Sequence, residues 1–551
     1  MVATVKIRDG WSNWIGDFGI GADRLVAKDK DDIISLVERA VQDGKRIRAV
    51  GSGHSASSCA RPRDRFIDLS EHSGLFPDVE WTKKNPPGVG DGERLVRVRS
   101  GTRIKTLSAE LAALPRPAGM INLGNFDGQT LAGAISTGTH GSGIALGAVA
   151  DLVVSVDMVT VTRSSDGSPH VQLRRFEPTN GITDRDEFNA AKHRHGMVLE
   201  QDDDTFRSVV VSYGCMGVAF AYTLRVRGEY WLREDTALMD WPQLRAALKD
   251  PIVPVVMGAG KNIPKFLTED RHLQLLINLA EAQGKKAKEE VACNIVRRNI
   301  TQAEQKPKIW LHDGWPPERR NTFLRGVLKG IADVIRPLRA HQDRDNLGRL
   351  LRNRYFEPEA REEPFAGNRT ATVSHICLKR DRDTSPPDKA PDPPDEAISL
   401  EMAVPAEHAA LAIDTIMDAI DDQKWLFPVP MAVRFAAASL NYLAPNYGRA
   451  TCYAEVVFLK AKTRDGGETF SPEETIERIA KPALSRIGRI IEDDPRLQGR
   501  PHMGKHNAMT REKLQKQYAS FEKWEAVFRR FNQFGTFEND FTDQLGLTGL
   551  R

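Results

Sequence analysis

Cysteine is scarce in this chain and follows no recognisable spacing. The five cysteines are scattered over 551 residues, an odd number without a Cys-x-x-Cys pair. This pattern argues against a disulfide framework and against a zinc site, and it favours reduced thiols in a cytoplasm. The sequence also lacks an apolar run near the ~20 residues that a membrane helix needs, and its first residues have no apolar signal region. We therefore expect a cytoplasmic protein without membrane insertion.

The chain also has no large excess of positive or negative charge. The 78 basic side chains nearly balance the 75 acidic ones, which gives a net charge of +3, and no block of Lys and Arg forms a tail. A nucleic-acid partner is therefore not indicated. The 40% hydrophobic and 28% charged content is that of an ordinary globular protein, and the length predicts two or three domains. Neither an oligomeric state nor a metal site can be inferred.

The common nucleotide fingerprints are absent, although glycines cluster. No P-loop lysine motif occurs, and no Gly-x-Gly-x-x-Gly opens a helix. Instead, residues 50–55 (VGSGHS) follow a predicted strand, Arg46–Val50. Gly51 and Gly53 can adopt positive φ and bring backbone N–H groups close to an anion, with the His54 imidazole beside them. A glycine turn next to a histidine is common, so an ordinary turn remains the alternative for this segment alone.

A second glycine-rich segment spans residues 123–143 (LGNFDGQTLAGAISTGTHGSG). Thr130–Ser136 is predicted to form a short helix with small residues on one face, followed by a loop rich in N–H and O–H donors. Leu, Ile and Ala interleave with the glycines, which indicates a buried loop of one shape rather than a linker. A third glycine turn, residues 214–218, precedes a predicted strand.

Taken in order, these three segments resemble the vanillyl-alcohol-oxidase-type flavoproteins, in the aldonolactone oxidase and alditol oxidase branch. The resemblance implies an α+β fold with a two-part FAD-binding domain and an α+β cap over the flavin. In many members the histidine of G-x-G-H-S is bonded covalently to the flavin, and His54 has that position. The residues that the resemblance assigns to FAD are Ala49, Val50, Gly51, Ser52, Gly53, His54, Ser55, Thr130, Ile135, Gly138, Ser142, Gly143, Ile144, Ala145, Val218 and His502.

The C-terminal part resembles the cap of the same branch. There a Glu-x-Arg-Phe strand precedes an Arg-x-(Ser/Thr)-Cys-Tyr strand, and Arg434 matches the arginine that faces the flavin. Ala432 replaces the glutamate, and residues two apart on a strand share a face, so the loss falls within the expected site. Glu455, on the face of Thr451, is a candidate to restore a carboxylate. The alternative is an exposed charge on a strand edge.

The last segments resemble further family motifs. Residues 500–507 (RPHMGKHN) match R-P-H-W-(A/G)-K with Met503 for tryptophan, and residues 531–539 match a terminal glycine motif. We therefore expect an FAD-binding domain at 1–228, a cap at 229–496 and a C-terminal return at 497–551. The charged stretches 261–308 and 318–354 are predicted to be helical and solvated, and residues 385–396, rich in proline and aspartate, to form an exposed loop.

These motifs predict an FAD-dependent oxidoreductase that oxidises a CH–OH group of a sugar-derived lactone or polyol, with dioxygen as acceptor. Arg434 and Lys505 are the candidate cations, and Glu455 is the candidate base. Oxidation of a bulkier hydrophobic alcohol, as in flavin-linked cholesterol oxidases, is an alternative that Ala432 and the long middle region favour. A flavin-binding protein without activity is the third possibility.

Overall fold

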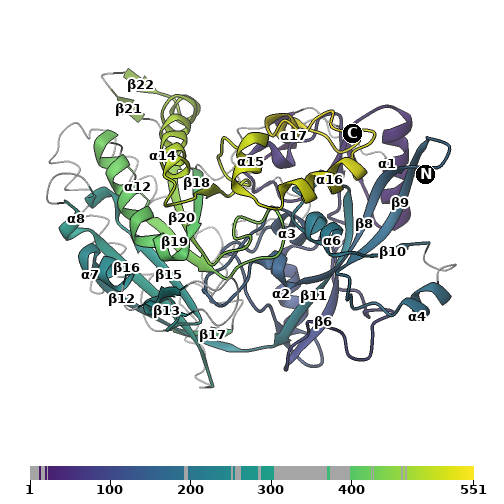
Figure 1. Cartoon of the computed structure of the whole chain (residues 1–551), viewed down its shortest axis with the longest axis horizontal. Helices are drawn as coiled ribbons and strands as arrows, with labels where there is room; N and C mark the ends of the chain where they lie inside the picture. The colour runs from purple at the N-terminus through teal and green to yellow at the C-terminus, as the bar shows by residue number, and fades with distance from the viewer. Residues whose placement is uncertain are drawn as a thin grey trace, which may run out of the picture.

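The computed structural model describes residues 11–13, 19–20, 23–191, 196–249, 252–254, 262–282, 287–302, 369–372, 397–423, 425, 427, 429–460, 463–465 and 468–551. Within these ranges the chain has an α+β fold built around two large sheets. The N-terminal and C-terminal segments lie together on one side of the molecule and the middle of the chain on the other (Figure 1).

A small parallel sheet carries the first glycine segment. Its strands are β3 (Asp23–Val26), β5 (Arg65–Asp68) and β4 (Ile47–Val50), in that spatial order. Helix α1 (Lys30–Gln42) connects β3 to β4 and is capped by the Asp29 side chain, which accepts from two backbone N–H groups. The helix buries Ile33, Leu36, Val37 and Ala40, the apolar stripe that the sequence predicts. Residues 51–55 therefore leave β4 at the carboxyl edge of the sheet.

The second sheet has six strands in the order β10-β9-β8-β11-β6, with β7 beside β11. Helices from both ends of the chain share one core with it, so the C-terminus packs on the N-terminal part, where Figure 1 draws α15, α16 and α17 in yellow. The strands are β6 (Glu93–Arg99), β7 (Ala118–Gly119), β8 (Val153–Arg163), β9 (Pro169–Glu177), β10 (Val198–Gln201) and β11 (Val218–Gly228), and the helices are α2 (Ile104–Ala112), α3 (Leu131–Ser136), α4 (Arg185–Ala190), α6 (Asp203–Val210), α15 (Arg511–Gln517), α16 (Phe521–Phe531) and α17 (Asp540–Gln544).

A buried ion cluster joins three strands of this sheet. Asp157 on β8 accepts from Arg175 on β9 through Nε at 2.8 Å and Nη2 at 3.1 Å, and from Arg97 Nη2 on β6 at 2.5 Å. Burial by itself would raise the pKa of Asp157, but the two guanidinium groups lower it to about 2. The pairing therefore stabilises the fold above about pH 4, where an unfolded aspartate is ionised, and this contribution is lost as the pH falls toward 2.

Replacing Asp157 by asparagine is expected to lower the free energy of unfolding by about 3–5 kcal/mol at neutral pH, because it removes the buried anion that two buried guanidinium groups share. Urea denaturation at pH 7 measures this change. Asp235→Asn is the matched control, since Asp235 forms an exposed pair with Arg233 and exposed pairs contribute about 0–1 kcal/mol. Equal losses in both variants would contradict the role given to the cluster.

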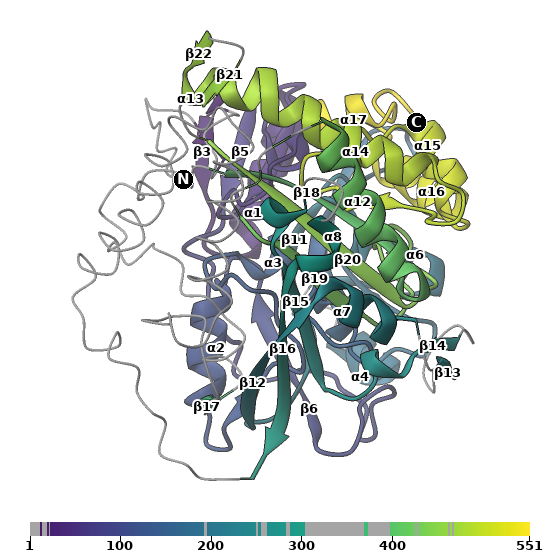
Figure 2. The same cartoon turned by 90° about the vertical axis from the view of Figure 1, so that its left-hand side faces the viewer.

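The eight-stranded sheet is formed mostly by the middle of the chain. Its order is β17-β12-β16-β15-β19-β20-β18-β23, and all pairs are antiparallel. Helices α7, α8 and α12 lie on its outer face, while β19 and β20 turn toward the N-terminal part (Figures 1 and 2). The strands are β12 (Trp231–Asp240), β15 (His272–Ile277), β16 (Ala292–Thr301), β17 (Arg369–Thr372), β18 (Ala397–Pro405), β19 (Met431–Ala436), β20 (Thr451–Leu459) and β23 (Arg500–Pro501), and the helices are α7 (Trp241–Ala247), α8 (Ala287–Glu290), α12 (Ala409–Gln423), α13 (Pro472–Thr475) and α14 (Lys481–Asp493).

Three short hairpins complete the described strands. They pair β1 (Trp11–Ser12) with β2 (Gly19–Ile20), β13 (Ile252–Pro254) with β14 (Asn262–Pro264), and β21 (Thr463–Asp465) with β22 (Glu468–Phe470).

The prediction of solvated helices for residues 261–308 is wrong for most of the described residues, although the short helix α8 lies within this stretch. They contain β15 and β16, which are central strands of the eight-stranded sheet and bury Leu273, Leu275 and Ile295. Among the many charges of this stretch, Arg297 and Arg298 lie on β16 and pair with Asp270 and Glu234. Residues 318–354 and 385–396 lie outside the described residues. The domain boundaries at 228 and 496 stay predictions.

Two negative expectations concern the described residues only. None of their helices is both long and apolar enough to span a bilayer. Their His, Cys, Asp and Glu side chains form no cluster suited to a metal ion. Cys59, Cys215, Cys293 and Cys452 are buried and are not joined in disulfides.

Candidate functional site

The first glycine loop, residues 50–55, meets the second glycine-rich segment, residues 123–143, at the carboxyl edge of the small sheet. The second loop, residues 137–143, is the end of that segment. A Cβ on Gly51 would lie 2.1 Å from Thr130 Oγ1, so the two segments touch where only glycine fits. Ser52 Oγ donates to the Gly128 carbonyl at 2.6 Å. Gly53 has φ of +69°, as expected, whereas Gly51 is not among the residues with positive φ; close approach, not φ, is what requires glycine there.

Local capping fixes the second loop. Thr130 is the N-cap of α3 and accepts from the Gly133 N–H, and buried Ile135 anchors the helix. Gly138 has φ of +72° and Gly143 φ of +130°, conformations that glycine tolerates best. Gly143 N donates to the Phe435 carbonyl at 2.8 Å, which joins the second loop to β19, the strand of Arg434.

The remaining residues assigned to FAD lie around these loops. Ser142 donates from Oγ to the Leu273 carbonyl, and His272 contacts the Ser142 carbonyl at 2.7 Å. Ile144 packs in the core of the eight-stranded sheet, whereas Ala145 is exposed. Ala49 and Val50 end β4, Val218 begins β11 in the core, and Ser55 accepts from Asn13 at 3.0 Å. His54 is partly exposed, with its ring 6.2 Å from that of Phe126.

The three candidate catalytic side chains form one hydrogen-bonded cluster. Glu455 Oε1 accepts from Lys505 Nζ at 2.8 Å, and Glu455 Oε2 accepts from Arg434 Nη2 at 3.3 Å. The side chains are 13%, 24% and 8% exposed for Glu455, Lys505 and Arg434. Glu455 lies on β20, an interior strand between β19 and β18, so the alternative of an exposed charge on a strand edge does not hold.

Glu455 faces the position where the family pattern places its glutamate. Residue 432 on β19 is the direct cross-strand partner of residue 455 on β20. Opposed Cβ atoms on neighbouring antiparallel strands are about 4.5–5.5 Å apart. Glu455 therefore places a carboxylate directly opposite Ala432 on the neighbouring strand.

Electrostatics keep the cluster ionised. Burial would raise the pKa of Glu455, but the Lys505 charge lowers it below its ordinary value. Burial would lower the pKa of Lys505, but the Glu455 and Glu401 charges raise it. Burial lowers the pKa of His502 to about 4, so that imidazole is neutral at pH 7. The site therefore presents a carboxylate held between two cations.

Two further side chains belong to the cluster and were missed by the sequence analysis. Glu401 on β18 is 2% exposed and accepts from Arg434 Nη2 at 2.9 Å. His140 in the second loop lies 3.0 Å from the same carboxylate oxygen. A signal existed for Glu401: it is the one acidic residue in the apolar strand ISLEMAVP, and a buried carboxylate needs a partner.

The first loop fits the pyrophosphate of the expected FAD. The backbone N–H groups of Gly51, Ser52 and Gly53 donate to no protein acceptor among the described residues. Ala56 N donates to the Gly504 carbonyl at 2.9 Å, which places the loop beside the segment that carries Lys505. Successive free N–H groups at a glycine turn form a cradle for an anion.

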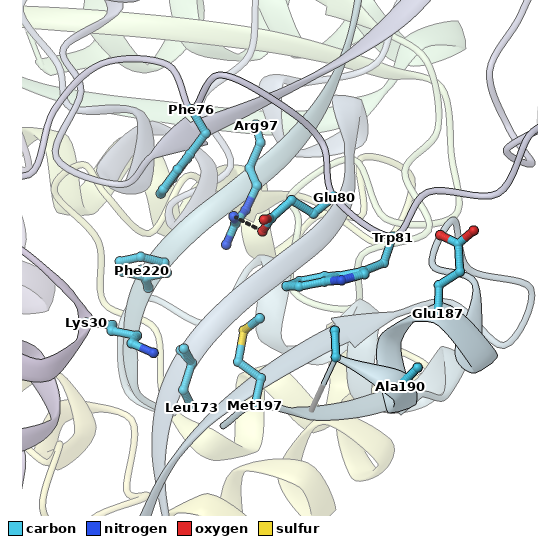
Figure 3. Close-up of a pocket in the computed structure, with 11 residues that line it drawn as sticks. Lys30, Phe76, Glu80, Trp81, Arg97, Leu173, Glu187, Ala190, Met197 and Phe220 are labelled. Carbon is cyan, nitrogen blue, oxygen red and sulfur yellow. Dashed lines mark ion pairs between the residues drawn. The ribbon is translucent and has the colours of Figure 1, made fainter. Parts of the chain in front are cut away.

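A separate cavity of about 570 Å³ lies in the N-terminal part (Figure 3). Phe76, Trp81 and Phe220 are among its walls. The arginine in its wall, Arg97, already pairs with protein groups. It binds Asp157, lies 3.7 Å from Glu80, and has its guanidinium carbon 4.2 Å from the Phe76 ring centroid. No residue of either glycine loop and none of the candidate catalytic residues lines this cavity. The candidate functional site is therefore the one at the glycine loops.

Two protein families match this chain. The family described as "FAD binding domain" matches residues 24–163, and the family described as "D-arabinono-1,4-lactone oxidase" matches residues 396–545. The two segments contain, respectively, the glycine loops and the Arg434–Glu455–Lys505 cluster.

Curated relatives agree with these matches. An L-gulono-1,4-lactone dehydrogenase of Mycobacterium tuberculosis is 24% identical over 97% of this chain and 98% of that protein. A D-arabinono-1,4-lactone oxidase of Kluyveromyces lactis is 31% identical over 42% of this chain and 38% of its own length. Among solved structures, a cholesterol oxidase of B. sterolicum superposes with a TM-score of 0.63 at 11% identity and covers 99% of this chain and 97% of its own. At that identity the likeness concerns the fold.

Proposed function

Because the chain belongs to the vanillyl-alcohol-oxidase-type flavoproteins, in the aldonolactone oxidase branch, we propose that it oxidises a CH–OH group of a sugar-derived lactone. The observation that carries this proposal is the carboxylate of Glu455 held by Lys505 and Arg434 beside the second loop. Such a cluster suits a small substrate with many hydroxyl and carbonyl oxygens. It does not suit the apolar body of a sterol, because ionised groups lose hydration against apolar surface.

Each side chain has a role in this proposal. When bound, FAD supplies the acceptor for the hydride that leaves the substrate carbon. Glu455 accepts the hydroxyl proton, Arg434 holds and polarises the substrate oxygen, and Lys505 compensates the negative charge that develops in the site. Dioxygen is the proposed final acceptor, with hydrogen peroxide as product. The buried cysteines of the described residues, which are not joined in disulfides, support a cytoplasmic location.

A substrate panel tests the function. The purified flavoprotein is mixed without oxygen with aldonolactones, polyols and hydrophobic alcohols, and bleaching of the flavin absorbance is followed. We expect lactones to bleach it at the lowest concentrations. Bleaching by hydrophobic alcohols alone would favour the sterol-type alternative, and a flavin that none of them reduces would favour a binding protein without this activity.

The covalent flavin link through His54 is a separate proposal. Replacing His54 by alanine is expected to convert protein-bound flavin into flavin that is released on acid precipitation, because the imidazole nitrogen that bonds the cofactor is gone. Flavin fluorescence of the precipitate and the supernatant measures the fraction. If the wild-type protein already releases its flavin, or if the variant retains it covalently, the link is assigned wrongly.

Gly51→Ala is expected to weaken FAD binding by at least about tenfold, a loss of ~1.4 kcal/mol, since a Cβ there would collide with Thr130 Oγ1 at 2.1 Å and displace the cradle. Titration of the deflavinated His54→Ala background with FAD measures the dissociation constant without the covalent link. Gly228→Ala is the matched control, because its Cβ meets nothing within 4 Å and Gly228 has no positive φ. Unchanged affinity in Gly51→Ala would contradict the cradle.

A further inference from the structure

Two buried arginines that begin family motifs have no part in the proposed function. Arg449 begins residues 449–453 (RATCY), and Arg500 begins residues 500–507 (RPHMGKHN). Their exposed fractions are 8% and 9%. All of their hydrogen bonds within the described residues go to backbone carbonyls, and neither pairs with a carboxylate there. A buried cation is unfavourable when no anion compensates it, so two such charges together call for one.

Both arginines lie beside Ala403 on β18. Tyr453 on β20 and Arg500 on β23 are the two cross-strand partners of Ala403, so their side chains leave the same face of the sheet on either side of a methyl group. Arg449 Nη2 donates to the Ala403 carbonyl at 3.0 Å. The ring of Tyr518, at the end of α15, has its centroid 4.5 Å from the Arg500 guanidinium carbon. Two guanidinium groups and two phenol rings therefore meet at this end of the sheet.

Three donors of this group have no acceptor. Among the described residues, Arg449 Nε and the hydroxyls of Tyr453 and Tyr518 are buried and have no hydrogen-bond partner. Burial raises the pKa of both phenols, so each keeps its O–H at neutral pH. A guanidinium N–H can only donate. Since a buried donor without an acceptor is unfavourable, what the group lacks is an acceptor.

The charges around the group favour a negative ligand. Burial and the charge of Arg500 lower the pKa of Arg449 to about 9. Glu407 raises this pKa less than either phenol does, so it is not the missing counterion. Glu492 on α14 acts on one of the phenols, but its carboxylate already accepts from Lys513 Nζ at 2.5 Å.

We propose that Arg449, Arg500 and the two tyrosine hydroxyls bind one small inorganic anion of the halide type, such as chloride. The ion supplies negative charge between two guanidinium groups and accepts from the three donors. The side chains around it are almost completely buried, so the site suits a single ion and not an organic carboxylate. Arg500 also donates to the carbonyls of Pro445 and Gln517, so the ion stabilises the contact between the eight-stranded sheet and α15.

Thermal unfolding tests the site without relying on the proposed function. The flavoprotein is unfolded in sodium chloride and in sodium gluconate of equal ionic strength, because gluconate is too large to enter. We expect chloride to raise the Tm by about 2 °C or more and to saturate, as for one site. Arg449→Gln should lose this rise, and Tyr518→Phe, which removes only the hydroxyl, should reduce it. Arg496→Gln is the control, because Arg496 is 66% exposed and pairs with Asp494.

The proposal is contradicted if chloride has no effect on the wild-type protein, or if the rise is equal in the wild type and in Arg449→Gln. Bromide locates the ion directly. In crystals of the flavoprotein soaked in sodium bromide, we expect an anomalous-scattering peak within hydrogen-bond distance of Arg449 Nε and a tyrosine hydroxyl. A water molecule in that place, or bromide peaks at surface side chains only, would overturn the assignment.

Discussion

Replacing Arg434 by alanine is expected to lower kcat/KM for a lactone by about 10²–10³-fold, the usual loss when one preorganised donor to a developing oxyanion is removed. Arg434 is 8% exposed and binds Glu401 and Glu455 at 2.9 and 3.3 Å. Its loss removes the cation proposed to polarise the substrate oxygen. It also leaves Glu455 held by Lys505 alone, so the carboxylate can move out of line with the substrate hydroxyl.

Steady-state kinetics on protein of verified FAD content measure this loss. Arg434→Lys keeps the charge but not the forked guanidinium, so it should recover only part of the activity. Arg233→Ala is the matched control, because Arg233 lies on β12 of the same sheet with its side chain 58% exposed. Activity of Arg434→Ala within about threefold of the wild type, a difference below ~1 kcal/mol, would exclude Arg434 from the site.

The parts of the site that are local in sequence could be predicted. The strand–loop unit at residues 46–55, the short helix before the second loop and the three catalytic candidates were found from motifs. Each motif is a continuous segment whose glycines, caps and hydroxyls determine its own backbone conformation. Arg434, Glu455 and Lys505 are indeed in contact, although their catalytic roles remain predictions.

What could not be predicted depends on pairing between distant strands. Glu401 and His140 are 261 residues apart, and the sequence around either residue does not predict that it contacts the other. Residues 272–277 and 292–301, which form β15 and β16, were wrongly expected to be helical because the many charges of the stretch 261–308 masked the alternating pattern of the two strands. Arg297 and Arg298 are neutralised by Asp270 and Glu234, and such pairing is visible only once the sheet is assembled. β propensity depends on these neighbours more than helix propensity does.

Glu455→Ala is expected to lower kcat/KM by about 10²–10⁴-fold, the range for loss of a general base. The pH profile of the wild-type enzyme supplies a second expectation. A carboxylate base works when ionised, so activity falls as the pH drops through its pKa. Burial opposes ionisation, but the Lys505 charge keeps the pKa of Glu455 below its ordinary value of 4.5, so the acidic limb of kcat/KM is expected below that pH. The limb should be absent from the residual activity of Glu455→Ala.

A second substitution tests whether Glu455 on β20 takes the place of the glutamate that the family pattern has at position 432 on β19. Because residues 432 and 455 face each other on β19 and β20, Ala432→Glu in the Glu455→Ala background should return a carboxylate to the same two cations. We expect it to recover at least about tenfold of kcat/KM, ~1.4 kcal/mol of the barrier. Ala432→Glu in the wild-type background should instead lower activity, because two carboxylates would compete for one pair of cations. If the double variant recovers nothing while it folds and binds FAD, then Glu455 does not substitute for the family glutamate, and the proton acceptor must be sought elsewhere in the cluster, with Glu401 as the remaining buried carboxylate.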